Sequence, residues 1–143
     1  MPNSRTIMVL KGGAVVLILF GILAAAGAMP ALSAPTLLLL DLAFWPLDGA
    51  QSLAAPETRL LCAVGGGVLV GWGALLFLLA DQIGSTDPAL VRKFVIVSIG
   101  SWFVVDSLGS VAAGAPMNAL FNVGFLLLFL IPVWNTERLQ TQP

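Results

Sequence analysis

The sequence predicts an all-α integral membrane protein: an antiparallel bundle of four spanning helices, with a short interfacial helix in the first outer loop. Composition is the first observation, because 59% of the 143 residues are hydrophobic, only 9% are charged, and the mean hydropathy is +1.03. A soluble domain carries about 25% charged residues. The second observation is that the apolar residues form four segments, each near the ~20 residues that cross roughly 30 Å of hydrocarbon. We therefore expect one four-span domain over residues 1–143.

Helix-start signals mark three of the four spans. Proline suits the first position of a helix, because the N–H that it lacks has no partner there. Pro56, Pro88 and Pro116 stand at such positions, and Asp87 precedes Pro88 as an N-cap. We expect the spans at residues 7–28, 57–80, 90–113 and 116–134.

The segment at residues 29–55 is the one long loop, and we place it outside. Its TLLLLDLAFWPLDG run is too apolar for a solvated loop and too short to span. It predicts an interfacial helix capped by Thr36, with Trp45 at the depth of the lipid headgroups. Asp41 and Asp48 are expected to face water. We interpret the segment as a lid on the outer mouth of the bundle, with a gate or partner surface as the alternative.

Basic residues predict the orientation. With both termini in the cytoplasm, five of the six Lys and Arg residues lie inside and only Arg59 lies outside, as the positive-inside rule requires. The basic start and the small residues after the first apolar core also resemble a secretory signal. Because the apolar run continues to Ala28, a membrane span is the better interpretation.

Composition also excludes several functions. The chain has no histidine, which rules out histidine-ligated haem, histidine proton relays and histidine zinc sites. Its only cysteine, Cys62, excludes an internal disulfide and a CxxC pair, and we expect it to be a packing residue. The net charge of −1 argues against a nucleic-acid partner. No nucleophile lies with a base, and no metal cluster is apparent, so we expect no enzymatic activity, metal or cofactor.

Glycines in the second span predict close helix packing. Gly67 and Gly71 form a GxxxG pair on one face, while Gly66 and Gly73 lie seven residues apart on another. Gly21 is a small residue that can face them from the first span. Since small residues let helix backbones approach closely in lipid, we expect the second span to be central and packed on two sides. The same pattern can mediate homo-oligomers.

The third span carries a carboxylate, Asp106, in the stretch SIGSWFVVDSLGSV. At 3.6 residues per turn, Ser98, Trp102, Asp106 and Ser110 share one face. That face should look into the bundle, because a carboxylate that faces lipid is destabilising by at least ~2.5 kcal/mol. The short AGAP connection makes the last two spans an antiparallel hairpin and brings Asn122 near Asp106.

These residues predict a polar niche in the outer half of the membrane, roughly 12 Å below the outer end of the third span. Asp106, Asn122 and Ser110 would form it, and Trp102 and Trp72 would form its floor. Arg59 lies about 9 Å above Asp106 on the same helix rise, and its long side chain would reach down to form an ion pair.

Three roles for Asp106 stay open: a structural hydrogen-bonding hub, a proton or substrate site for transport, or a contact with a partner subunit, lipid headgroup or pigment. Val95, Val91 and Leu90 lie below Ser98 and resemble an apolar plug. The plug favours a non-enzymatic accessory or small-ligand or lipid-binding bundle over a small proton-coupled transporter or channel. Membrane lipid is the expected partner, with a second copy or another membrane protein as further possibilities.

The chain resembles the small four-helix bacterial membrane proteins related to DoxX. The likeness rests on the long loop after the first span, on PETR followed by GGG and GWG, on the acid late in the third span, and on the short final hairpin. It covers most of the chain. It implies an antiparallel four-helix fold in the bacterial inner membrane, and no catalytic residues carry over from it.

Overall fold

The computed structural model describes the backbone of residues 4–138 and the side chains of residues 4–134, and every regular element in it is a helix. The four long helices are α1 (Ser4–Ala26), α3 (Pro56–Gln82), α4 (Pro88–Ala112) and α5 (Pro116–Arg138). Between α1 and α3 lie the one-turn helix η1 (Pro30–Leu32) and the helix α2 (Ala34–Phe44). All four long helices are long and apolar enough to cross a membrane. The predicted all-α four-helix fold is confirmed.

The surface of the long helices suits hydrocarbon. Large apolar side chains are exposed along each of them, including Val16, Val68, Val105 and Leu127. An apolar surface of this extent has no counterpart on a soluble monomer. The chain is therefore a multi-pass membrane protein.

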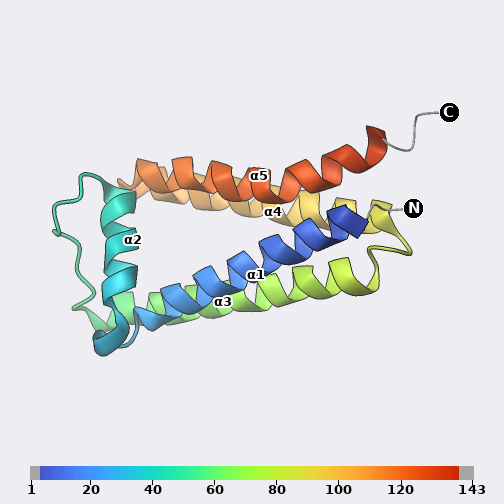
Figure 1. The fold of residues 1–143 in the computed structure, drawn as a ribbon. Coiled ribbons are helices and arrows are strands. Elements are labelled where there is room, and N and C mark those ends of the chain that lie inside the picture. The colour runs from blue at the N-terminus through green and yellow to red at the C-terminus, as the bar shows by residue number, and fades with distance from the viewer. Residues whose placement is uncertain (1–3, 139–143) are drawn as a thin grey trace.

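The long helices form two pairs, α1 with α3 and α4 with α5 (Figure 1). Figure 1 shows the pairs close together at the end where α3 connects to α4, and apart at the other end. There α2 lies across the bundle and bridges the two pairs. We call this the α2 end of the molecule.

Glycines bring α1 and α3 together. A Cβ on Gly66 would lie 2.5 Å from the backbone nitrogen of Ala25, and one on Gly21 would lie 2.7 Å from the carbonyl oxygen of Gly66. A Cβ on Gly73 would lie 2.7 Å from the side chain of Ile18. Only glycine allows this approach, so the predicted packing role of these three residues is confirmed.

The second face of α3 does not pack as we expected. Cβ atoms built on Gly67 and Gly71 meet nothing within 4 Å, and α3 barely contacts α4. The prediction that this helix is central and packed on two sides is wrong. The physical reason is the divergence of the two pairs, which moves α4 away from α3 over most of its length.

The hydrophobic core lies in the half of the bundle away from α2. Buried side chains from all four long helices meet there, among them Leu10, Leu76, Val95, Ile99 and Phe129. The predicted plug residues Val91 and Val95 are part of this core, whereas Leu90 is only partly buried. In this half the bundle is closed.

Polar contacts hold the ends of the helices. Lys11 on α1 pairs with Asp81 on α3, with 2.6 Å between Nζ and Oδ1. Asp87 caps α4 as predicted, since its Oδ1 accepts a hydrogen bond from the backbone N–H of Leu90 at 2.9 Å. Arg92 lies over the ring of Trp134.

The short helix of the long loop is present, but Thr36 does not cap it. The helix begins at Ala34, and the Thr36 hydroxyl donates to the carbonyl oxygen of Leu23 at 2.8 Å. Gly27 makes room for this contact, because a Cβ there would lie 2.7 Å from the Thr36 methyl. Thr36 therefore docks α2 onto the end of α1.

Asp41 does not face water as we expected. Its side chain is only 9% exposed, and its two oxygens accept from the backbone N–H of Gly49 at 3.1 and 3.2 Å. A carboxylate is a strong acceptor for a loop N–H, so Asp41 holds the chain that follows α2. Asp48 and Trp45 are exposed, as expected for a surface loop.

Candidate functional site

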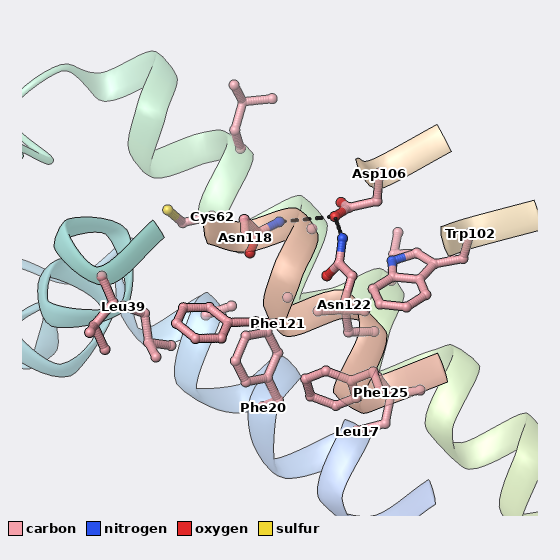
Figure 2. Close-up of a pocket in the computed structure, with 17 residues that line it drawn as sticks. Leu17, Phe20, Leu39, Cys62, Trp102, Asp106, Asn118, Phe121, Asn122 and Phe125 are labelled. Atoms are coloured by element: carbon pink, nitrogen blue, oxygen red, sulfur yellow. Dashed lines mark hydrogen bonds between the residues drawn. The ribbon is translucent and has the colours of Figure 1, made fainter. Parts of the chain in front are cut away.

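A cavity of about 680 Å³ lies at the α2 end, between the two helix pairs (Figure 2). All four long helices and α2 contribute to its walls. It exists because the pairs diverge here, while the core fills the other half of the bundle. Its volume lies within the roughly 300–1,000 Å³ that small-molecule sites occupy.

Asp106 of α4 is at the centre of the polar wall. Its Oδ2 accepts hydrogen bonds from Nδ2 of Asn118 at 3.0 Å and from Nδ2 of Asn122 at 2.6 Å (Figure 2). Nδ2 of Asn118 also donates to Ser110 Oγ at 2.8 Å, and Nδ2 of Asn122 donates to Ser107 Oγ at 3.2 Å. We call these five residues the polar cluster.

The hairpin of α4 and α5 assembles this cluster. Asn118 and Asn122 lie four residues apart, so both amides project from one face of α5. Gly114 reverses the chain with a φ of 81°, a conformation that glycine adopts without strain. The reversal takes few residues, so the start of α5 lies beside the end of α4.

The rest of the cavity wall is almost entirely apolar. The ring of Phe125 contacts Phe20 of α1 and Trp102 of α4, with centroid distances of 5.3 and 6.1 Å. Leu39 and Leu42 close the wall at α2. The cavity is therefore amphipathic, with the polar cluster at one side of a long apolar space.

On α3, the wall of the cavity includes residues that are also exposed on the apolar surface of the bundle. Its lining residues Leu61 and Val68 on α3 are 70% and 64% exposed. They belong to the same surface that presents apolar side chains to lipid, and α3 makes few contacts with α4.

The structure brings most of the expected niche residues together. Asp106 and Asn122 are hydrogen-bonded, Ser110 reaches Asp106 through Asn118, and Trp102 lines the cavity. Trp72 packs on Trp102 at a centroid distance of 5.8 Å, but it faces a smaller groove of about 310 Å³ with Ser98. Trp72 therefore packs against Trp102 without lining the larger cavity.

Arg59 does not reach the cluster. Its Nε donates to the carbonyl oxygen of Leu53 at 2.7 Å, and no ion pair joins it to Asp106 within residues 4–134. The loop that follows α2 runs close to the start of α3 and supplies this nearer acceptor. The expected ion pair is not formed.

Asn118 and Ser107 were missing from the expected niche. The spacing of Asn118 and Asn122 already placed both amides on one face, which is the signal that identifies Asn118. Ser107 gave no such signal, because its position beside Asp106 puts it about 100° around the helix. Asn122 reaches it only because the two helices pack closely.

No group of three or more metal-ligating side chains occurs within residues 4–134. Cys62 lines the cavity and is a free thiol. The polar chemistry of the cavity therefore resides in one carboxylate, two amides and the indole N–H of Trp102.

Comparison of this chain with protein-family models, with curated proteins and with solved structures finds no match.

Proposed function

We propose that the protein is a non-enzymatic, multi-pass membrane protein that binds one amphipathic molecule from the bilayer in this cavity. The observation that carries the proposal is the cavity itself: an apolar space with one hydrogen-bonding wall, lined on α3 by residues that are exposed on the apolar surface. Ligand sites have this composition, with mostly apolar walls and a few placed polar groups that orient the ligand. The bound molecule would place its head on the polar cluster and its tail against Phe20 and Phe125.

The closed half of the bundle supports binding rather than transport. Ile99 and Phe129 are almost completely buried directly beyond the cavity, and Val91 and Val95 continue the seal. A proton-coupled transporter or channel would need a chain of polar groups or water through this region. We therefore keep transport as the alternative that the experiments below can detect.

We infer that the α2 end faces outward and that both termini are cytoplasmic, in a bacterial inner membrane. Arg5, Lys11, Arg92 and Lys93 lie at the opposite end, which supports this orientation by the positive-inside rule. Single cysteines test it in a Cys62→Ser background. A membrane-impermeant maleimide should label Asp48→Cys on intact cells and leave Ser85→Cys unlabelled; the reverse pattern would contradict the orientation.

A cavity-filling variant tests binding itself. Gly65 lines the cavity, and a Cβ built there meets nothing within 4 Å. Gly65→Phe should therefore fill the space without a backbone clash. Gly71→Phe is the matched control, because Gly71 has equal room on the same helix and does not line the cavity.

The measurement is native mass spectrometry of protein extracted in a mild neutral detergent. We expect one bound small molecule on the wild-type chain and on Gly71→Phe, and at least a fivefold lower occupancy on Gly65→Phe. If no variant carries a bound species, or if Gly65→Phe carries as much as Gly71→Phe, the binding proposal fails.

Proteoliposomes separate binding from transport. With an imposed pH gradient, we expect the wild-type protein to leave the proton permeability of the vesicles unchanged. A flux that Asp106→Asn abolishes would instead support the transporter.

A further inference from the structure

Toward the cavity, the free hydrogen-bonding capacity of the polar cluster lies on the acceptors of Asp106, Asn118 and Asn122, because Ser107 and Ser110 do not line the cavity. The side-chain NH₂ groups of Asn118 and Asn122 both donate to Asp106 Oδ2, and each also donates to one of the two serine hydroxyls. Asp106 Oδ1 and the two amide oxygens accept no hydrogen bond from any residue in the described part of the chain. None of the three is a sealed, unsatisfied atom. All three therefore remain available to a molecule in the cavity.

The amide oxygen of Asn122 belongs to a largely buried residue and accepts no hydrogen bond from the described part of the chain. The side chain of Asn122 is only 4% exposed. The oxygen itself keeps some accessible surface, so a donor in the cavity can form a hydrogen bond with it. Among the polar residues that line the cavity, Trp102 supplies one further free group, its indole N–H, so one free donor stands against three free acceptors.

Charge gives the second argument. Asp106 makes no ion pair with any Lys or Arg whose side chain the structure describes. Lys11 pairs with Asp81 at the other end, and Arg59 bonds to Leu53. A carboxylate in a low-dielectric site is stable when an opposite charge or strong donors compensate it. The amide donors of Asn118 and Asn122 compensate part of the carboxylate's charge, and a cationic ligand would compensate the rest.

We propose that the ligand is a chain amphiphile with a primary-amine head group; this rests on the proposed function. The ammonium has three N–H donors, which match the three free oxygens of Asp106, Asn118 and Asn122. Trp102 lines the same cavity, and the faces of aromatic rings attract ammonium groups. The alkyl chain lies along Phe121, Phe125 and the α3 wall, and the molecule enters from the bilayer between α3 and α4.

Other head groups match the wall less well. An alcohol offers one donor and no charge, and a quaternary ammonium offers charge without an N–H donor. A carboxylate or phosphate head would meet the like charge of Asp106 and acceptors where it needs donors. These differences can be tested with probes that share one alkyl chain and differ only in the head group.

Oleylamine, oleyl alcohol and oleyltrimethylammonium share one chain, and their affinities for the full-length protein can be compared by native mass spectrometry in a neutral detergent. We expect oleylamine to bind at least about tenfold more tightly than either of the others, since charge-assisted hydrogen bonds are about twice as strong as neutral ones. In Asp106→Asn the preference over oleyl alcohol should vanish while oleyl alcohol still binds. Asp48→Asn removes an exposed aspartate at the same end and should keep the preference.

Equal binding of oleylamine and oleyl alcohol by the wild-type protein would overturn the amine assignment and leave the binding function standing. A preference that survives in Asp106→Asn would also overturn it. If none of the three probes binds, the proposed function fails together with the head-group assignment. If Asp106→Asn does not fold, the comparison of the three probes on the wild-type protein still tests the amine assignment.

Discussion

At the scale of single residues, Asp106 determines how the last two helices meet. Two amides of α5 converge on one carboxylate oxygen of α4, and each amide is also bonded to a serine of α4. Such a network ties one helix to another through four hydrogen bonds. The network should therefore contribute to the free energy of unfolding, as well as to the affinity for any ligand that it binds.

Replacing Asp106 tests this structural part. Asp106→Leu removes the acceptor and leaves two amide groups without their partner, so the free energy of unfolding should fall by about 1–3 kcal/mol. Asp106→Asn keeps an acceptor oxygen and should lower it by less than half as much. Reversible unfolding in bicelles measures both. A leucine variant as stable as the wild type would show that the cluster does not stabilise the fold.

Arg59 and Asp106 should act independently. Because Arg59 bonds to Leu53 and makes no ion pair with Asp106, the losses from Arg59→Ala and Asp106→Asn should add within about 0.5 kcal/mol. The double variant, measured in the same unfolding assay, completes the cycle. A coupling energy above about 1 kcal/mol would mean that the two side chains do pair.

At the scale of the helices, small residues have different consequences on different faces of α3. Gly66 lies against the backbone of α1, Gly65 lines the cavity, and Gly67 lies on an open surface. The sequence pattern identified small faces but could not tell which of them meets a helix. That depends on where α4 stands, and α4 is held away by the splay of the two pairs.

Adjacent glycines provide a matched test of this packing. Gly66→Ala would place a Cβ 2.5 Å from backbone atoms of α1, so the helices must separate, and we expect the free energy of unfolding to fall by about 1–3 kcal/mol. Gly67→Ala meets nothing within 4 Å and should be neutral or slightly stabilising, because alanine favours the helix. The same unfolding assay compares them. Equal effects at the two positions would contradict the α1–α3 contact.

Helix positions were more predictable than tertiary contacts. Proline and aspartate signals placed the starts of α3, α4 and α5 within two residues of those observed, because these signals act locally. The roles of Thr36 and Asp41 were missed, since their partners, Leu23 and Gly49, are defined only when the loop folds over the bundle. The hairpin arithmetic found Asn122 because a short turn leaves few alternatives for the register.

At the scale of the whole molecule, the bundle is asymmetric along its length. One half has a closed core that includes Ile99 and Phe129, and the other half holds the cavity beneath α2. The sequence predicted a polar niche, and it predicted α2 as a lid. It did not predict a cavity, because cavity volume depends on the angle between helix pairs, and no local pattern encodes that angle.

Photocrosslinking can show whether this cavity binds an amphiphile from the bilayer. An oleylamine analogue with a diazirine in its chain would be photolysed with the wild-type protein in nanodiscs, and the adducts mapped by mass spectrometry. We expect adducts on cavity residues such as Cys62, Leu69 and Phe121, and their loss with excess unlabelled oleylamine. Adducts spread evenly over lipid-facing residues such as Val16 and Leu127, with no loss on competition, would contradict binding in this cavity.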